Sequence, residues 1–174
     1  MAIAQRTGFK INTTRTDPYK NFRFRVFFQS KPNDPIIGIS KVTGLKRTTE
    51  VVSHRDGGDL STPRHAPGRT TFEAITLERG VTFDTEFEAW ANNVYSTDGP
   101  EAVSLANYKR HLIIRVYNLQ DVPVKSYTVF NCWVSSYTAL PDLDANANAT
   151  MIESIVLQNE GWERDEALTE QAEQ

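Results

Sequence analysis

Regular alternation of apolar and polar residues is the feature that most limits how this chain can fold. In residues 21–28, NFRFRVFF, the apolar side chains of Phe22, Phe24, Val26 and Phe28 fall on one face, and arginines separate the first three. Side chains of a strand point alternately to opposite faces, so a period of two predicts a strand. Further strands are expected in IIGISKV, GLKRTTEVVSH, TTFEAITLERG, HLIIRVYNL, VKSYTVFNCWVSSY and TMIESIVLQNEGW.

One segment, at about residues 84–96, changes to a helical period. Its apolar residues are spaced i, i+3, i+4 and i+7, as in an amphipathic helix: Phe87, Trp90, Ala91 and Val94. Thr85 and Glu88 stand at capping-box spacing, and Gly99 followed by proline is a stop signal. About seven strands and one helix predict a mainly β fold, an antiparallel barrel or sandwich with the helix packed on it.

The length and charge of the chain restrict its class. A chain of 174 residues is expected to form one domain over residues 17–165, with a flexible arm at 1–16 and an acidic tail at 166–174. The net charge of −3 argues against a protein that grips nucleic acid. The sequence lacks a long apolar run and a secretory signal, so we expect no membrane span and synthesis in a cytoplasm.

The stretch PDLDANANATMIESI raises the question of calcium binding. Six oxygen-bearing residues occupy positions 1, 3, 5, 7, 9 and 12 of an EF-hand window: Asp142, Asp144, Asn146, Asn148, Thr150 and Glu153. Against this, Ala147 stands where the loop needs glycine, both flanks alternate with period two, and Glu153 is expected inside a strand. The favoured interpretation is a polar loop entering a strand, and a calcium-dependent β-sandwich binding module remains the alternative.

No enzyme motif is found in the sequence. Cys132 could pair with one of His54, His65 and His111, but their spacings match no zinc pattern. Cys132 adjoins Trp133 in the middle of a predicted strand, which is typical of a packed, inert thiol. The prediction is therefore a protein that is not an enzyme and uses no metal or cofactor.

Two features point to contacts with other subunits. Basic and acidic residues mix in and around a predicted loop that runs from Asp56 to Gly68 and is too long for a hairpin turn. Large apolar residues also lie on the strand faces opposite the main apolar ones: Phe27, Tyr117, Tyr127 and Trp133. Either a neighbouring subunit covers that second face, or a two-sheet sandwich buries these residues itself.

Four separated segments carry a resemblance to a known family: DPYKNFRFRV, VTGLKRTTEVVSHRDGGD, PGRTTFEAITLERGVTFDTEFEAWAN and LPDLDANANATMIESIVLQNEGWERD. They resemble, in order, the tail-tube proteins of contractile phage tails and bacterial contractile injection systems. The resemblance implies a β-barrel-like subunit with one helix, six of which form a continuous barrel ring, and rings that stack into a hollow tube. It also implies as partners other copies of the chain, a contractile sheath protein, baseplate and cap proteins, and a cargo protein or DNA in the lumen, all within a phage tail-like particle.

The resemblance assigns roles to particular positions. The extended loop is expected to contact a neighbouring subunit or ring through Arg55, Asp56, Gly57, Gly58, Asp59, Arg64, Pro67, Gly68 and Arg69. Structural roles are expected for Gly80, which would permit a turn, for Trp90, which would anchor the helix, and for Asp142 and Asp144 in the polar loop. The chain departs from the family pattern at Asp121 and Val122, where many members have a hairpin glycine.

Overall fold

The computed structural model describes residues 19–168, except 56, 59–62, 96–105 and 145–148. Within these residues the chain is mainly β with one helix, as predicted. In chain order, the elements are β1 (Phe24–Phe28), β2 (Ile39–Val42), β3 (Arg47–His54), β4 (Arg64–Phe72), β5 (Ile75–Gly80), α1 (Glu86–Asn92), β6 (Arg110–Tyr117), β7 (Pro123–Thr138), β8 (Ile152–Gln158) and β9 (Gly161–Arg164).

A single antiparallel sheet forms the body, with strand order β1-β6-β7-β8-β5-β2 and β9 paired to β7. β7 joins the two halves: its first part pairs with β6 and β9, and its last part pairs with β8. Asn131 lies at this change of partner with φ of 50°, beside a register shift in the β6–β7 pairing. Such an irregularity bends a strand and increases its twist, so the two halves of the sheet can face each other across one core.

The core consists of inward-facing residues from both halves of the sheet and from the helix: Val26, Phe28, Ile75, Leu77, Phe87, Trp90, Leu112, Val129, Cys132, Ile155 and Leu157. The Trp90 ring meets Phe28 edge-on at 5.3 Å between centroids, and its indole N–H donates to the carbonyl of Tyr108 at 2.9 Å. Burial of a large aromatic together with its polar atom fixes α1 against the sheet.

Side chains of the same chain cover two of the large residues on the second face of the sheet. Arg115 lies over the ring of Phe27, and Arg25 lies over the ring of Tyr117. Both aromatic residues are more than 90% buried. At these two positions the second face therefore needs no neighbouring subunit, because arginine stems and guanidinium groups pack well on aromatic rings.

The helix is shorter than the predicted 84–96 and begins differently. Thr85, at the N-cap position, makes no side-chain capping bond. The backbone N–H of Glu86 instead donates to the Asp84 carboxylate at 2.9 Å. Asp84 supplies the acceptor because Arg79 holds its carboxylate in place, with 2.8 Å between Arg79 Nη1 and Asp84 Oδ2. The capping-box prediction was wrong.

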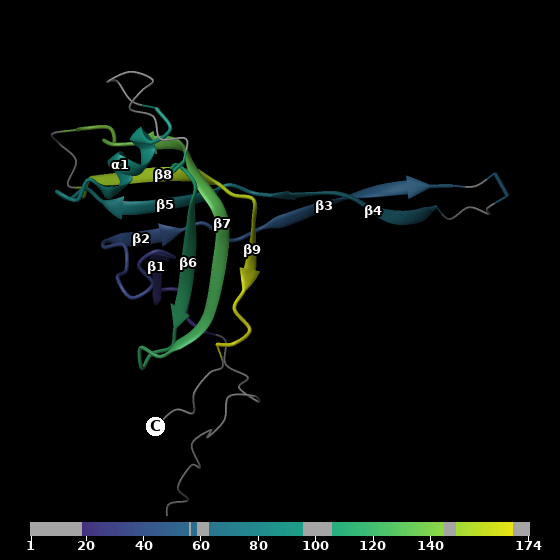
Figure 1. Ribbon diagram of the computed structural model, residues 1–174, viewed down its shortest axis with the longest axis horizontal. Helices are drawn as coiled ribbons and strands as arrows, with labels where there is room; N and C mark the ends of the chain where they lie inside the picture. The colour runs from purple at the N-terminus through teal and green to yellow at the C-terminus, as the bar shows by residue number, and fades with distance from the viewer. Residues whose placement is uncertain (1–18, 56, 59–62, 96–105, 145–148, 169–174) are drawn as a thin grey trace, which may run out of the picture.

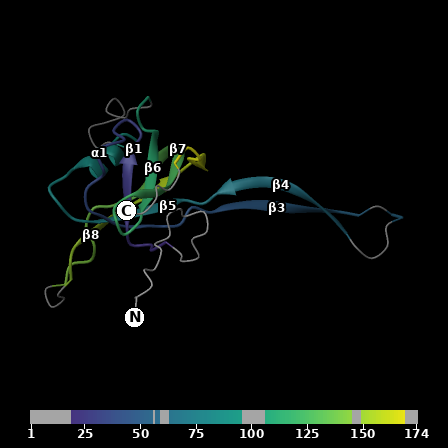
Figure 2. The same cartoon turned by 90° about the horizontal axis from the view of Figure 1, so that it is seen from below.

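The strands β3 and β4 form a hairpin that projects far from the body (Figures 1 and 2), and among the described residues they pair only with each other. The structure corrects the predicted loop over 56–68, because β4 already begins at Arg64. Gly68 permits close pairing here: a Cβ at this position would lie 2.9 Å from Val52 Cγ2 and 3.3 Å from the Glu50 carbonyl oxygen. The strand predicted in GLKRTTEVVSH is β3, whereas the first part of β4 was missed because the hairpin buries neither face and shows no apolar alternation there.

Candidate assembly surface

The hairpin exposes almost every residue of its two strands to solvent. Its strands are held by backbone pairing and by a few polar cross-strand contacts, such as Thr49 to Thr70 at 3.0 Å and Ser53 to His65 at 3.1 Å. An isolated two-stranded hairpin is at best marginally stable in water. A surface that packs against the hairpin from outside the chain would therefore add much of its stability.

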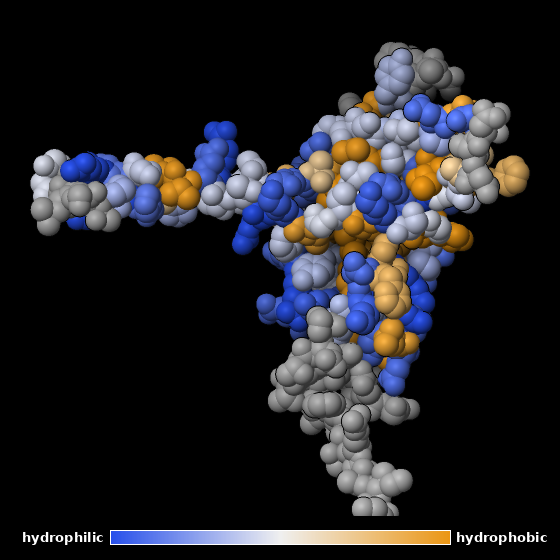
Figure 3. Space-filling view, turned by 180° about the vertical axis from the view of Figure 1, so that it is seen from behind, coloured by the Kyte–Doolittle hydropathy of each residue, from blue (hydrophilic) through white to orange (hydrophobic). Residues whose placement is uncertain are grey.

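Apolar side chains are exposed near the middle of the hairpin. Val51 and Val52 are adjacent on β3 and are 67% and 51% exposed. Adjacent strand residues point to opposite faces, so each face of the arm carries one apolar side chain. Figure 3 shows an apolar band on the otherwise polar hairpin. A partner that packs on the arm would remove these two side chains from water, which is favourable.

The charge of the hairpin has the opposite sign to the charge of the whole chain. Residues 47–72 contain four arginines and three acidic residues, whereas the full chain carries −3. The described residues on the strands and the adjoining turn include Arg47, Glu50, Arg55, Arg64 and Arg69. A weakly positive arm on an acidic body favours contact between the arm of one copy and the body of another.

The structure brings most of the predicted contact residues together. Arg64, Pro67, Gly68 and Arg69 lie in β4, and Arg55, Gly57 and Gly58 follow the end of β3. Asp56 and Asp59 lie outside the described residues. No neighbouring chain is present, so contact of these residues with another subunit stays a prediction.

The root of the hairpin is fastened to β9 through residues that the sequence did not reveal. The Phe72 ring meets Trp162 edge-on at 6.4 Å, and Asn159 Nδ2 donates to the carbonyl of Glu73 at 2.9 Å. Gly161 has φ of 138°, and a Cβ there would approach the Phe72 ring to 3.3 Å. The sequence signal at this place was the Asn-Glu-Gly turn before Trp162. Only the fold shows that Gly161 of this turn lies against the Phe72 ring.

A second cluster surrounds the buried side chain of Arg79, near the end of β5, and connects β5 with β8 and with the start of α1. Its Nε donates to the Glu153 carboxylate, its Nη2 donates to the Asp84 carbonyl at 2.6 Å, and its guanidinium lies 4.0 Å from the Phe87 ring centroid. The Tyr137 hydroxyl donates to Glu153 at 3.1 Å. Burial, and then this hydrogen bond, raise the pKa of Tyr137 to about 12.

The structure also locates the predicted structural residues. Trp90 is fully buried in the core. Gly80 ends β5, and among the described glycines only Gly38 and Gly161 have positive φ. A Cβ at Gly80 would meet nothing within 4 Å, and its role in a turn stays a prediction.

The calcium window is divided between an exposed loop and a buried strand. Asp142 and Asp144 are exposed, and Asn146 and Asn148 lie outside the described residues. Glu153 lies within β8, as predicted, is 4% exposed and is paired with Arg79. A carboxylate held by a buried arginine is not available as the bidentate ligand that closes an EF-hand loop. This observation weighs against the calcium interpretation.

Cys132 has the environment of an inert thiol. It is fully buried, its Sγ lies 3.7 Å from the Val129 carbonyl oxygen, and burial raises its pKa to about 12. Of the three candidate histidines, His54 and His65 lie on the projecting hairpin. His111 lies on the neighbouring strand β6, where its Nδ1 accepts a hydrogen bond from the Asn131 backbone N–H at 3.1 Å. A thiol that stays protonated and inaccessible is a poor nucleophile. In the part of the chain that the structure describes, no helix has the length and apolar character needed to cross a bilayer.

Comparison with known proteins agrees with this architecture. The sequence profile described as "T4-like virus tail tube protein gp19" matches residues 20–163. No match is found among curated proteins. The fold is similar to a chain in the anti-feeding prophage (AFP) baseplate, with 23% identity over 86% of this chain and 97% of the other, and a TM-score of 0.69.

Two further solved structures share the fold. A chain of the PVC extracellular contractile injection system, in its sheath–tube complex, is 23% identical over 85% of this chain and 91% of the other, with a TM-score of 0.68. A chain of a gene transfer agent particle is 10% identical over 85% of this chain and 99% of the other, with a TM-score of 0.52.

The family match over most of the chain assigns it to a class of structural tube proteins rather than to enzymes. This chain belongs to the T4-like virus tail tube protein family, whose members form part of phage tail-like particles.

Proposed function

We propose that this chain is the inner-tube subunit of a contractile injection system or contractile phage tail. Six copies form a ring, rings stack into a rigid hollow tube, and contraction of a surrounding sheath drives the tube through a target envelope. The tube conveys a protein or DNA cargo. The observation that carries the proposal is the projecting β3–β4 hairpin, which exposes nearly all of its surface and has no partner strand in the described part of the body.

The shape of the chain supports assembly by repeated, identical contacts. The hairpin leaves the body on one side, so an arm that packs on the next copy makes a head-to-tail contact (Figure 1). Contacts of this kind generate a ring when the rotation closes and a filament when it does not. The Val51 and Val52 side chains would then be buried against the acidic body of the neighbour.

The sheet also has two ends. β1 and β2 terminate the strand order, and among described residues neither has a second strand partner apart from one bridge between Phe27 and Pro35. Exposed sheet edges favour pairing with further strands. Joining such edges between subunits would extend the sheet around a ring and give the tube its stiffness.

The solved structures of similar fold support the proposed partners. Their descriptions name a six-fold symmetrised baseplate, a sheath–tube complex and a tube-terminating cap. We therefore propose that this tube contacts a sheath along its length, a baseplate at one end and a cap at the other. Its copies are expected to interact with one another before any of these partners bind.

The proposal is tested by weakening the hairpin contact without unfolding the subunit. Val51→Ser combined with Val52→Ser removes the exposed apolar groups, and Thr48→Ser combined with Thr71→Ser is the matched control on the same strands. Light scattering against protein concentration should show loss of assembly only in the valine variant, while circular dichroism stays that of the wild type. Normal assembly of the valine variant would contradict the assigned role of the hairpin.

A further inference from the structure

Four neighbouring strands of the sheet share one end, on the side of the body away from the hairpin. In the order β7-β8-β5-β2, the strands β7 and β5 end there, whereas β8 and β2 begin there. Gly80, the last residue of β5, pairs with Ile152, the first residue of β8. The hairpin leaves from the opposite end of β2 and β5, because it connects the end of β2 to the start of β5 (Figure 1).

Exposed apolar side chains gather at this shared end of the four strands. They lie on the segments that leave or enter the strands, and we call them the distal patch: Ile37, Phe83, Leu140, Leu143, Met151 and Ile152. Each of these residues is at least 41% exposed. The Val81 backbone N–H donates to the Met151 carbonyl at 3.0 Å, which holds the segment before Phe83 beside the start of β8. Several exposed apolar groups on one surface are typical of a protein contact.

Acidic side chains flank the distal patch. Glu88 is exposed on α1 and interacts electrostatically with Tyr137, near the end of β7. Asp142 is exposed on the loop that carries the two leucines of the patch. Among the described cations, Lys31 and Arg110 act on carboxylates at the start of α1. A partner that fits this surface is therefore apolar at its centre and basic at its edges.

The two faces of the hairpin differ in composition. Val51 is directly opposed by Pro67, and opposed residues of an antiparallel pair have their side chains on the same face. The other face carries Val52 and Glu50, because a Cβ at Gly68 would lie 2.9 Å from Val52 Cγ2 and 3.3 Å from Glu50 Cβ. The acidic flanks of the distal patch would repel Glu50, so the Val51 face fits the patch better.

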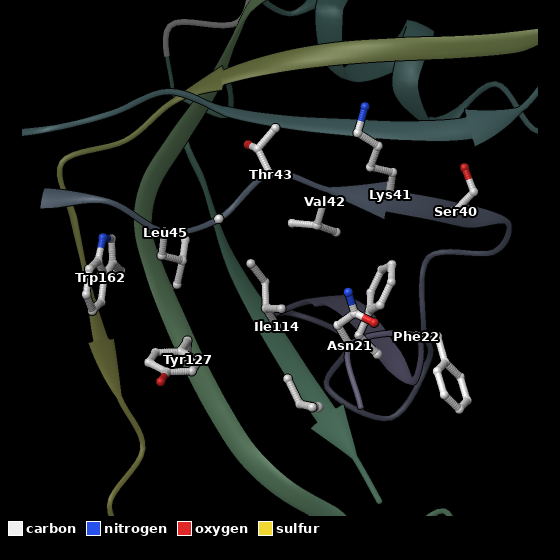
Figure 4. Close-up of a pocket in the computed structure, with 13 residues that line it drawn as sticks. Asn21, Phe22, Ser40, Lys41, Val42, Thr43, Leu45, Ile114, Tyr127 and Trp162 are labelled. Carbon is white, nitrogen blue, oxygen red and sulfur yellow. The ribbon is translucent and has the colours of Figure 1, made fainter. Parts of the chain in front are cut away.

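The groove between the edges of the sheet is another apolar surface of the body. Val42 and Leu45 point toward Ile114 and Tyr127 across this groove (Figure 4). Its walls include the edge strands β1 and β2, which the proposed ring joins to neighbouring copies. A hairpin that packs elsewhere leaves these edges free to pair between subunits.

We propose that the distal patch of one copy receives the Val51 face of the hairpin of the next copy. Val51 and Pro67 meet the apolar residues of the patch, and the arginines of the arm lie toward Glu88 and Asp142. The arm and the patch lie at opposite ends of the same strands, so the contact is head-to-tail and repeats from copy to copy. This inference rests on the proposed tube function, because it names the surface that the arm contacts.

Disulfide trapping between chains tests the proposal. Val51→Cys on one chain and Phe83→Cys on a chain with a longer tag should form mixed dimers several-fold faster than Val52→Cys with Phe83→Cys, because adjacent strand residues point to opposite faces. Leu119→Cys is the reference on the body, since this residue is 60% exposed but lies in the turn between β6 and β7. It should trap Val51→Cys no faster than Val52→Cys. The native Cys132 thiol is buried and should not compete.

Equal trapping of Val51→Cys and Val52→Cys by Phe83→Cys, including no trapping of either, would overturn the proposal. Trapping of Val51→Cys by Leu119→Cys as fast as by Phe83→Cys would also overturn it, because the contact would then not be specific to the patch.

A charge reversal provides an independent readout. Glu88→Lys with Asp142→Lys should raise several-fold the protein concentration at which light scattering detects assembly. The control Glu163→Lys with Glu166→Lys makes the same change in net charge at exposed positions on and after β9, and should leave that concentration nearly unchanged. Equal effects of the two variants would show that net charge alone matters, and would overturn the assignment of the acidic flanks.

The possible outcomes separate this inference from the proposed function. Rings or tubes seen by electron microscopy, together with equal trapping rates, would overturn the distal patch as the receiving surface and leave the tube function standing. A wild-type protein that stays monomeric at every concentration would overturn both.

Discussion

Arg79 and Glu153 form a buried ion pair between neighbouring strands β5 and β8, where they are directly opposed in the antiparallel register. Arg79 is fully buried, and Glu153 is 4% exposed. The same guanidinium also binds Asp84, whose carboxylate accepts from the first turn of α1. One arginine thus connects two strands to the start of the helix.

Breaking this pair on one side should destabilise the subunit strongly. Arg79→Met leaves Glu153 as an uncompensated buried charge, and we expect a loss of about 3–5 kcal/mol in the free energy of unfolding. The double variant Arg79→Met with Glu153→Leu should recover much of that loss, because both charges are gone. Urea unfolding measures both values. A single variant within about 1 kcal/mol of wild type would show that the pair is not desolvated in solution.

The stability of the subunit should depend on the ionisation of Asp84 in acid. Burial alone would raise the pKa of this carboxyl, but hydrogen bonds from the Glu86 N–H and from Arg79 lower it below its ordinary 3.8. A lowered folded pKa means that the stabilisation is complete above the unfolded pKa and is lost as pH falls through the folded one. Asp84→Asn keeps a cap but cannot ionise, so its unfolding free energy should fall less steeply below about pH 4. Parallel pH profiles for the two proteins would contradict this assignment.

Two glycines should respond in opposite ways to alanine. Gly161→Ala forces a side chain into positive φ against the Phe72 ring, and we expect a cost of about 1–3 kcal/mol. Gly80→Ala meets no neighbouring atom and should be neutral or stabilising by up to about 1 kcal/mol. Thermal unfolding distinguishes them. Equal effects at the two sites would argue against the close approach of Phe72 to β9.

The Cys132 thiol should react with a thiol reagent only when the subunit opens. Burial and the raised pKa of about 12 predict labelling over hours in native buffer and within seconds in denaturant. Kinetics of reagent absorbance measure both rates. Rapid labelling of the native protein would show that the Cys132 thiol is accessible and reactive, as an activated cysteine would be.

The body of the fold was predictable because its strands bury one face. Ile75 and Leu77 alternate with polar residues as expected of half-buried strands, and Arg79 continues their inward series. Glu153 likewise falls in the inward series of Ile155 and Leu157. Two opposite charges at inward positions of two strands were a signal for the ion pair, although only the register shows that they meet.

The start of β4 and the root of the hairpin were not predictable from the same pattern, although the Thr- and Val-rich segment that forms β3 was expected to be a strand. β4 has almost no buried residue, so burial imposes no period on its sequence, and Pro67 and Gly68 instead resemble a loop. The contact between Gly161 and Phe72 joins residues that are distant in sequence, and the sequence around either residue gives no signal for it. Asp121 is a different case: it adopts φ of 64°, a left-handed conformation that glycine favours and that aspartate tolerates.

The proposed self-assembly into a stacked tube is tested by electron microscopy of the purified protein at rising concentration, with and without a calcium chelator. We expect six-fold rings or stacked tubes in the wild type whether or not the chelator is present, and we expect neither in the Val51→Ser and Val52→Ser variant. A folded wild-type protein that stays monomeric at every concentration, or whose assembly requires calcium, would show that the chain does not form the proposed tube.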